Sequence, residues 1–362
     1  GMGLRRPSAA RAAAAPPPTA GEPTAEPRAW SLVLVGLMLV VLTLVAYGPA
    51  YRAGFIWDDD DYVTDNATLD DADGLARIWL EPGATPQYYP LTFTSFWLEH
   101  QVYGDAPLGY HVTNVLLHAA NALLAWLVMR RLRIPGAWLA AAIFALHPVH
   151  VESVAWITER KNLLSGVGYL GALLLALGVG GALDAAPTDR TATLRRAGVL
   201  ALFVAALLAK TVACTLPVVL LLVLWWRRHR IERRTLVATL PLFAIGAALA
   251  LVTIWMEHTH VGARGVLFEL APLQRVLIAG RALWFYVATL VWPHPLSFVY
   301  ERWDVDPRVW WQWLFPVAAL AVGIGLWLLR ARLGRWPLVA ALGFAVTLAP
   351  ALGFVDVYPM RY

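Results

Sequence analysis

The chain has 362 residues, of which 59% are hydrophobic and 15% are charged, with a net charge of +5 and a mean hydropathy of +0.58. Soluble domains carry about 25% charged residues, so this composition excludes an ordinary soluble enzyme and predicts an all-α polytopic membrane protein. The single cysteine, Cys214, excludes an intrachain disulfide. The sequence has no Gly-rich phosphate loop and no basic patch interleaved with aromatic residues, so we expect no nucleic-acid partner.

The N-terminal third of the chain combines a tail, an anchor and an acidic loop. Residues 1–29 are rich in Ala, Pro and Arg and predict a disordered cytoplasmic tail. The apolar run Trp30–Tyr47 is long enough to cross a bilayer and predicts a membrane anchor. Residues 48–108 hold eleven Asp or Glu side chains against two Arg, which we interpret as a large first external loop. Apolar spacing around 75–80 and 92–102 predicts short helices along the membrane surface within that loop.

Later apolar runs predict a bundle of about nine to ten membrane helices, since each run approaches the length that a bilayer requires. The expected spans after the first are 109–130, 136–148, 163–183, 197–209, 212–226, 236–256, 274–292, 310–329 and 337–354. Arg281 interrupts the run 274–292, and a full crossing there would put a basic loop outside. We therefore expect a broken or re-entrant helix at this position. Lys210–Pro217 predicts the turn of a hairpin between two short runs.

Basic residues indicate the orientation of these spans. Most of the 29 Lys and Arg residues lie in the tail and in the segments 130–133, 190–196, 227–234 and 330–335. The positive-inside rule places these segments and the N-terminus in the cytoplasm. The acidic first loop, a second external loop at 147–162 and the C-terminal end then face the periplasm, the lumen or the exterior.

The first candidate site is the stretch Phe55–Tyr62, in which four consecutive carboxylates, Asp58 to Asp61, are bracketed by aromatic residues. Adjacent acids repel one another, so some of them would have raised pKa values. An acid in this position could act as a general base, bind a metal ion, or do both. The alternative is a solvated loop, which is the common role of a run of like charges.

The second candidate site is the stretch His147–Asn162, at the outer end of the third span. His147, His150 and Glu152 are candidate ligands of a divalent metal ion, because imidazole and carboxylate groups suit several such ions. A hydrogen-bonded loop closure around Pro148 is the alternative.

Cationic side chains in or near the membrane form a third group of candidates. Arg160 and Lys161 are either interface anchors or ligands of a phosphate, which both side chains bind well. Lys210, Arg281 and Arg361 are isolated charges, and such groups are expensive in a bilayer unless they serve a function.

A polar stripe follows one face of the second predicted span. His111, Asn114, His118 and Asn121 recur at helical spacing and share an arc of about 80°. Polar groups in a membrane helix face the bundle interior or a wet cavity. Interhelical hydrogen bonding and the lining of a cavity are both open for this stripe.

Several long motifs occur in an order that is typical of a known family. They are Phe55–Asp60 (FIWDDD), Tyr89–Phe96 (YPLTFTSF), Gly109–His118 (GYHVTNVLLH), His147–Lys161 (HPVHVESVAWITERK), Lys210–Pro217 (KTVACTLP) and Met360–Tyr362 (MRY). From about residue 30 to its end, the chain resembles the membrane half of the transmembrane-and-tetratricopeptide-repeat O-mannosyltransferases and their bacterial relatives, within the GT-C glycosyltransferase superfamily. The resemblance implies a GT-C-like transmembrane domain over residues 30–362.

The resemblance also implies an activity and roles for the candidate residues. The expected reaction transfers a sugar from a polyprenyl-phosphate-linked donor to a hydroxyl group of a protein, lipid or glycan acceptor, with inversion at the anomeric carbon. Asp58 or Asp59 would be the catalytic base. The donor phosphate would bind to Arg160, Lys161 and Arg361, and Glu152 would shape the acceptor or metal site. His111, Asn114 and His118 stay candidates for the acceptor or cavity lining on account of their helical spacing. A requirement for a divalent metal ion stays open, as does the set His147, His150 and Glu152 as its ligands.

Two other classes of protein compete with the enzyme. A transporter, or an isoprenoid-lipid-binding protein without transferase activity, would also place charged residues in the membrane. Transporters usually consist of two similar halves, and no internal repeat is visible here. A non-catalytic scaffold would be indifferent to the loss of Asp58 or Asp59.

Overall fold

The computed structural model describes residues 29–178, 190–256, 259 and 270–354, so the predicted tail up to residue 28 and Arg361 lie outside the described residues. The described residues form helices and turns without any strand, which confirms the predicted all-α class. The α-helices are α1 (Ala29–Ala46), α2 (Ala72–Leu80), α3 (Pro90–Tyr103), α4 (Pro107–Arg131), α5 (Ala137–Leu146), α6 (Val151–Ala155), α7 (Arg160–Ala176), α8 (Arg190–Ala209), α9 (Leu216–Arg228), α10 (Arg233–Met256), α11 (Pro272–Val291), α12 (Leu314–Leu333) and α13 (Trp336–Leu348). Short turns are η1 (Gly48–Arg52), η2 (Asp60–Thr64), η3 (Pro148–His150), η4 (Ile157–Glu159), η5 (Thr211–Thr215), η7 (Trp310–Trp313) and η8 (Ala349–Ala351).

The described helices confirm a polytopic membrane protein. Five helical segments are long and apolar enough to cross a bilayer, namely α4, α8, η5 with α9, α10, and η7 with α12. A sixth would be α5 continued by η3 and α6, which bend by 50° at their junction. Helices α1 and α13 are apolar but shorter. The larger count of nine to ten membrane helices stays a prediction.

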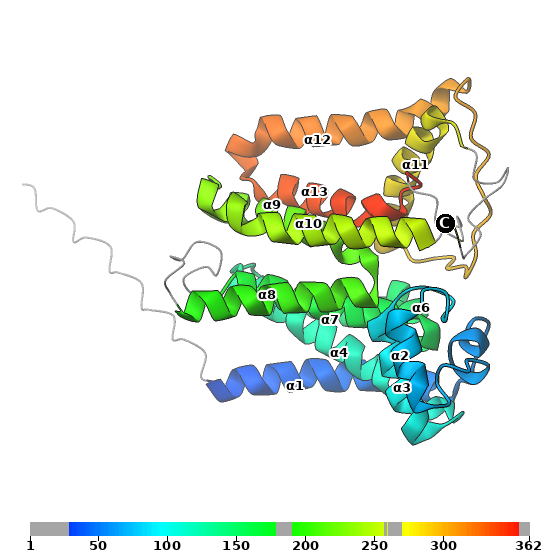
Figure 1. Ribbon diagram of the computed structural model, residues 1–362. Coiled ribbons are helices and arrows are strands. Elements are labelled where there is room, and N and C mark those ends of the chain that lie inside the picture. The colour runs from blue at the N-terminus through cyan, green and yellow to red at the C-terminus, as the bar shows by residue number, and fades with distance from the viewer. Residues whose placement is uncertain (1–28, 179–189, 257–258, 260–269, 355–362) are drawn as a thin grey trace, which may run out of the picture.

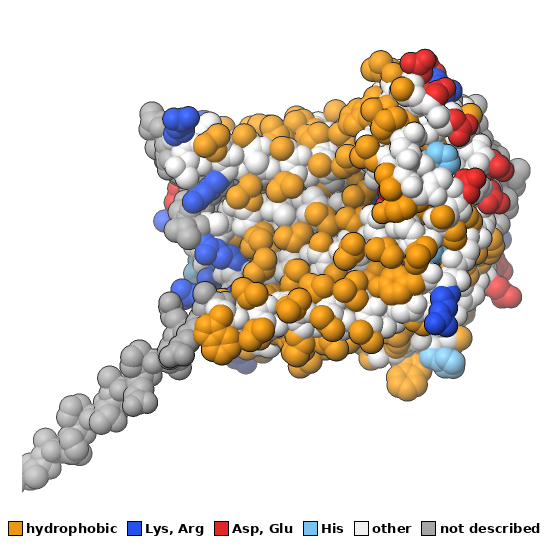
Figure 2. Space-filling model, turned by 90° about the horizontal axis from the view of Figure 1, so that it is seen from below, with side chains coloured by type: hydrophobic (Ala, Val, Ile, Leu, Met, Phe, Trp, Pro, Cys, Tyr) orange, Lys and Arg blue, Asp and Glu red, His pale blue; other side chains and the backbone are white. Residues whose placement is uncertain are grey.

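Charge and polarity divide the two ends of the bundle. The long helices run roughly side by side, and α2, α3 and α6 gather at one end (Figure 1). Figure 2 shows most of the visible Lys and Arg side chains at one end of a broad apolar band, and most of the visible Asp and Glu side chains at the other end. The turn between α8 and α9 lies at the same end as α6, and Lys210 is the residue with which this turn begins.

The largest buried core joins α7, α8, α9 and the C-terminal end of α4. Small residues let α7 and α8 approach closely, as is common between membrane helices. A Cβ atom on Gly168 would lie 2.7 Å from the carbonyl oxygen of Leu202 and 2.9 Å from the Cβ atom of Ala206. Phe203, also on α8, is fully buried in this core.

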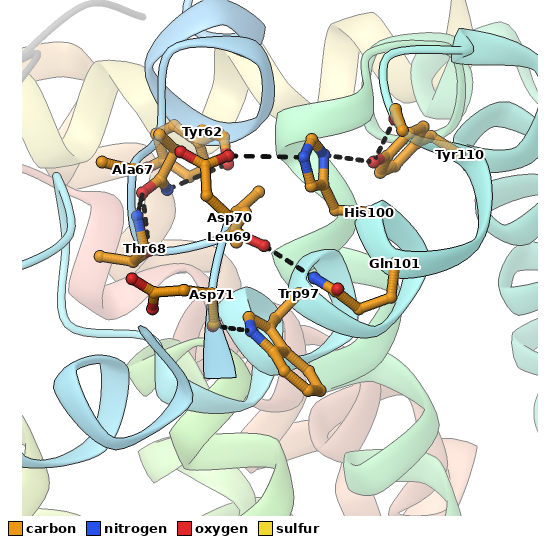
Figure 3. Close-up of polar contacts among 12 residues, drawn as sticks. Tyr62, Ala67, Thr68, Leu69, Asp70, Asp71, Trp97, His100, Gln101 and Tyr110 are labelled. Atoms are coloured by element: carbon orange, nitrogen blue, oxygen red, sulfur yellow. Dashed lines mark hydrogen bonds and ion pairs between the residues drawn. The ribbon is translucent and has the colours of Figure 1, made fainter. Parts of the chain in front are cut away.

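The first loop is a small folded unit with its own core. The expected surface helices are present as α2 and α3, and Tyr62, Ile78 and Phe93 are among the side chains buried between them and α4. Figure 3 shows how polar contacts tie residues 66–71 to α3. Gln101 donates to the carbonyl oxygen of Leu69 at 2.7 Å, and the Trp97 indole donates to that of Asp71 at 2.8 Å. Side-chain hydrogen bonds therefore fix the first loop to α3 at the end of the bundle.

Helix α11 differs from its prediction. It is one unbroken helix over Pro272–Val291, so the expected break in 274–292 is wrong, whereas the re-entrant alternative stays a prediction. Gly280, in its middle, faces Pro316 at the beginning of α12, where a Cβ atom would come within 2.6 Å of the proline nitrogen. The two helices therefore cross near the start of α12, and the Arg281 guanidinium lies over the Trp303 ring at 4.4 Å. The cation–π contact with Trp303 stabilises the charge of Arg281, so the helix continues through a residue at which the sequence predicted a break.

Candidate active site

The four adjacent aspartates separate into buried and exposed groups. Asp59 is fully buried, whereas Asp58, Asp60 and Asp61 are exposed. The separation begins at Trp57, whose φ of 49° lies in the left-handed region that a bulky residue rarely adopts. Such a conformation costs about 1–3 kcal/mol and is concentrated at functional sites. It sharply turns the chain, so that Asp58 points outward and Asp59 points inward.

Asp59 joins the first loop to the second. Its Oδ1 atom accepts hydrogen bonds from the Thr158 backbone N–H at 2.8 Å and from the Thr158 hydroxyl at 2.5 Å. Its Oδ2 atom accepts from the Ile56 N–H at 2.9 Å. Burial raises the pKa of the Asp59 carboxyl, although these hydrogen bonds and the nearby His111 act in the opposite direction. Both oxygens are thus engaged in holding the two loops together.

Asp58 has a different environment. Within the described part of the chain, no side-chain hydrogen bond or ion pair engages its carboxylate. Next to it, the Trp57 ring packs against Phe298 at 4.1 Å and Trp156 at 6.0 Å between ring centroids. Phe298 belongs to the segment between α11 and η7, so three loops distant in sequence meet beside Asp58. An exposed carboxylate beside an aromatic wall can accept a proton from a bound hydroxyl group.

Arg160, a predicted phosphate ligand, is fully buried. Its guanidinium forms an ion pair with Glu99 of α3 and donates to the Asn114 side chain at 2.8 Å and the Tyr110 carbonyl at 2.9 Å. The group also lies over the Phe96 ring at 4.7 Å. The charge of Arg160 is matched one to one by Glu99, and its contacts join α3, α4 and α7.

Lys161, the neighbouring candidate, belongs to a group that we call the lysine cluster: Glu159, Lys161, Asn162 and Lys210. The ammonium groups of Lys161 and Lys210 lie 2.9 Å and 3.7 Å from the Glu159 carboxylate. Lys210 also donates to the Asn162 side chain at 2.6 Å. Burial alone would raise the pKa of Glu159, but Lys210 and Lys161 outweigh it and lower the value to about 2. Glu152, exposed nearby, interacts electrostatically with the same lysines.

The polar stripe of α4 makes interhelical contacts. Asn114 donates to the carbonyl of Trp156 at 3.2 Å, and Asn121 donates to that of Leu163 at 2.9 Å. An imidazole nitrogen of His118 lies 3.0 Å from the Ala145 carbonyl oxygen. His111 is also buried, close enough to Asp59 to influence its charge. These contacts correspond to the interhelical alternative for the stripe.

The candidate metal ligands point to different partners. His147 contacts the carbonyl oxygen of Leu290 at 3.0 Å, whereas the His150 ring packs on Phe144 and His118. Within residues 29–178, 190–256 and 270–354, no group of three His, Cys, Asp or Glu side chains is placed to hold a metal ion. Arg361 lies outside the described residues.

Sequence reasoning did not anticipate the partners of these candidates. Glu99 carried no signal beyond the acidity of its loop, and Thr158 carried none. Lys210 did carry a signal, since it is a lone charge between two apolar runs, but its partners are 48 and 51 positions away. Such contacts follow from the packing of α7 against α8 and not from any local pattern.

Comparisons with known proteins place the chain beside one group of enzymes. No family model and no solved structure matches it. Protein O-mannosyl-transferase F38B6.6 of Caenorhabditis elegans is 30% identical over 153 residues, which are 38% of this chain and 22% of that protein. Protein O-mannosyl-transferase Tmtc1 of Drosophila melanogaster is 38% identical over 145 residues, 37% of this chain and 17% of its own length. Human protein O-mannosyl-transferase TMTC4 is 29% identical over 169 residues, 40% of this chain and 22% of its own length.

The similarity is thus confirmed but partial. The matched segments cover about two fifths of this chain, less than the expected extent from residue 30 to the end, and about one fifth of each of these relatives. Over those segments, the chain is similar to proteins named O-mannosyl-transferases.

Proposed function

We propose that the chain is a membrane glycosyltransferase that moves mannose from a polyprenyl-phosphate donor to a hydroxyl group of a protein acceptor. The names of its relatives support the reaction class and the sugar. Apolar helices able to cross a bilayer support a donor that is itself a membrane lipid. The separation of basic and acidic ends supports a cytoplasmic N-terminus and a site on the opposite face.

Asp58 is the catalytic base in this proposal. Its carboxylate takes the proton of the acceptor hydroxyl while the hydroxyl oxygen attacks the anomeric carbon of the sugar. The bond from that carbon to the phosphate oxygen breaks, its electron pair leaves with the polyprenyl phosphate, and the configuration inverts. The observation that carries the assignment is the contrast between the exposed Asp58 and the buried Asp59 with both oxygens engaged. Asp59 positions the turn through Thr158.

The test is transfer of radiolabelled mannose from a polyprenyl-phosphate donor in proteoliposomes. General-base catalysis contributes about 10²–10⁴-fold, so Asp58→Asn should lower turnover by that order. Asp60→Asn is the matched control, since Asp60 is also exposed in the same run, and it should retain nearly full turnover. Each variant must elute as a monodisperse species.

Full turnover by Asp58→Asn would overturn the assignment of the base. Donor binding without turnover in the wild type and in every variant would instead favour the isoprenoid-lipid-binding alternative.

A further inference from the structure

The lysine cluster has an imbalance of charge that Arg160 and Glu99 do not have. Two ammonium groups share the single carboxylate of Glu159, and the side chains of Lys161, Glu159 and Lys210 are only 9%, 13% and 27% exposed. Glu152 is nearby and exposed, but it forms no ion pair with either lysine among the described residues. A mostly buried site in which two ammonium groups pair directly with one carboxylate favours the entry of a further anion.

The donors of the cluster are also incompletely used. Each ammonium group has three hydrogens. Lys161 donates to Glu159 and Lys210 donates to Asn162, while the contact of Lys210 with Glu159 is longer, at 3.7 Å. Ammonium hydrogens therefore stay available to an incoming oxygen. Lys161 lies in the first turn of α7, directly after η4.

The position of the cluster connects it with the candidate active site. Lys161 lies three positions after Thr158 in the sequence, and Thr158 donates hydrogen bonds to Asp59. The Lys161 ammonium also lies 5.2 Å from the centre of the Tyr62 ring, at the end of the aspartate turn. Lys210 approaches from the extended link between α8 and η5, and its side chain is 27% exposed.

From these observations we propose that Lys161 and Lys210 form a binding site for a phosphate group, with Glu159 as an internal counter-ion that holds the two lysines in place while the site is empty. The phosphate is that of a lipid phosphate or of free phosphate, since both present the same oxygens. If the phosphate belongs to a lipid donor, the inference rests on the proposed function. Lys210 then binds the donor phosphate, a role that Arg160 does not fill because its guanidinium is already paired with Glu99.

The test measures protection of the full chain against thermal unfolding by three probes, because a ligand that binds the native state stabilises it. The probes are farnesyl phosphate, inorganic phosphate and farnesol. Farnesyl phosphate should protect and farnesol should not. Protection by inorganic phosphate at similar concentration would identify a free-phosphate site, whereas its failure would identify a lipid-phosphate site.

Variants then locate the phosphate. Lys161→Gln and Lys210→Gln should each weaken binding about tenfold to a hundredfold, as expected for a lost charge-assisted hydrogen bond. Lys210→Arg should retain binding. Arg77→Gln is the control, since Arg77 is an exposed cation of the first loop that pairs with Asp71, and it should bind like the wild type. Glu159→Gln should bind more tightly, because the internal competitor is gone.

Two results would overturn the inference: no protection of the wild type by either phosphate probe, or unchanged protection of Lys210→Gln and Lys161→Gln. A cluster with only a structural role would make Glu159→Gln less stable without raising its phosphate affinity. Asp58→Asn should bind farnesyl phosphate like the wild type. Binding without mannose transfer in the wild type would therefore leave this site intact while the proposed function fails.

Discussion

The part of the molecule around α4 and α7 and the part formed by α12 and α13 bury different kinds of side chain. Around α4 and α7, Asp59, Asn114 and Arg160 are fully buried. Asp59 accepts a hydrogen bond from the Thr158 backbone, and Arg160 of α7 donates one to Asn114 of α4. Helix α12 has no fully buried residue, and apolar side chains such as Val317, Leu320 and Leu328 are exposed along it. In a bilayer, exposed apolar surface is solvated by lipid, whereas buried charge needs a specific partner. We therefore expect single substitutions to change the stability of the protein more around α4 and α7 than in α12.

The largest expected effect is the loss of Arg160. Arg160→Met would leave Glu99 in a buried position without its counter-charge, which costs about 3–5 kcal/mol. We expect poor folding, measured as a lower midpoint of thermal unfolding in detergent. The double variant Arg160→Met with Glu99→Gln should recover most of the loss. If the single variant unfolds like the wild type, the buried pair is not what joins α3, α4 and α7.

A matched pair of leucines compares α12 with the buried core that α9 shares with α7. Leu220 of α9 is fully buried, whereas Leu320 of α12 is 64% exposed. Leu220→Ala should lower the free energy of unfolding by about 2–5 kcal/mol through the cavity it leaves. Leu320→Ala should change it by less than about 0.5 kcal/mol. Equal losses in the two variants would mean that α12 is covered by protein and not by lipid.

A smaller effect is expected at the link between the first and second loops. Thr158→Val removes the hydroxyl donor to Asp59 and keeps the backbone donor, at a cost of about 1.5–3 kcal/mol for a bond to a charged group. We expect mannose transfer to fall while farnesyl phosphate binding stays near that of the wild type. Thr158→Ser, which retains a hydroxyl, should restore transfer. A loss of both properties in Thr158→Ser would contradict a positioning role of this bond.

The smallest effect concerns acid stability. The pKa of Glu159 in the folded protein is about 2, below its ordinary value of 4.5. The ionised carboxylate therefore stabilises the fold fully above pH 4.5, and this contribution is lost as the pH falls towards 2. Thermal midpoints measured at pH 6 and pH 3 should differ less in Glu159→Gln than in the wild type. An identical fall in both proteins would show that the two lysines do not depend on Glu159.

The sequence alone determined the class and most helix positions, whereas the location of the site stays a prediction. Runs of apolar residues and amphipathic spacing are local properties, so the anchor, the surface helices α2 and α3 and most spans up to α10 could be predicted within a few residues. The exceptions are the end of α7, at Ala176 and not at 183, and the start of α8, at Arg190 and not at 197. The error at α11 has a physical cause. A charge in an apolar run suggests a break, but the stacking of Arg281 on Trp303 allows the helix to continue.

Only the tertiary structure separated the roles of neighbouring charges. In the sequence, Asp58 and Asp59 are adjacent residues of the same type, and Arg160 and Lys161 are adjacent cations. Their environments differ because Thr158 lies 99 positions from Asp59, Glu99 lies 61 positions from Arg160, and Lys210 lies 48 positions from Asn162. Burial and the partner across the bundle decide whether a charge holds the fold together or stays available to a ligand, and both depend on how distant helices pack.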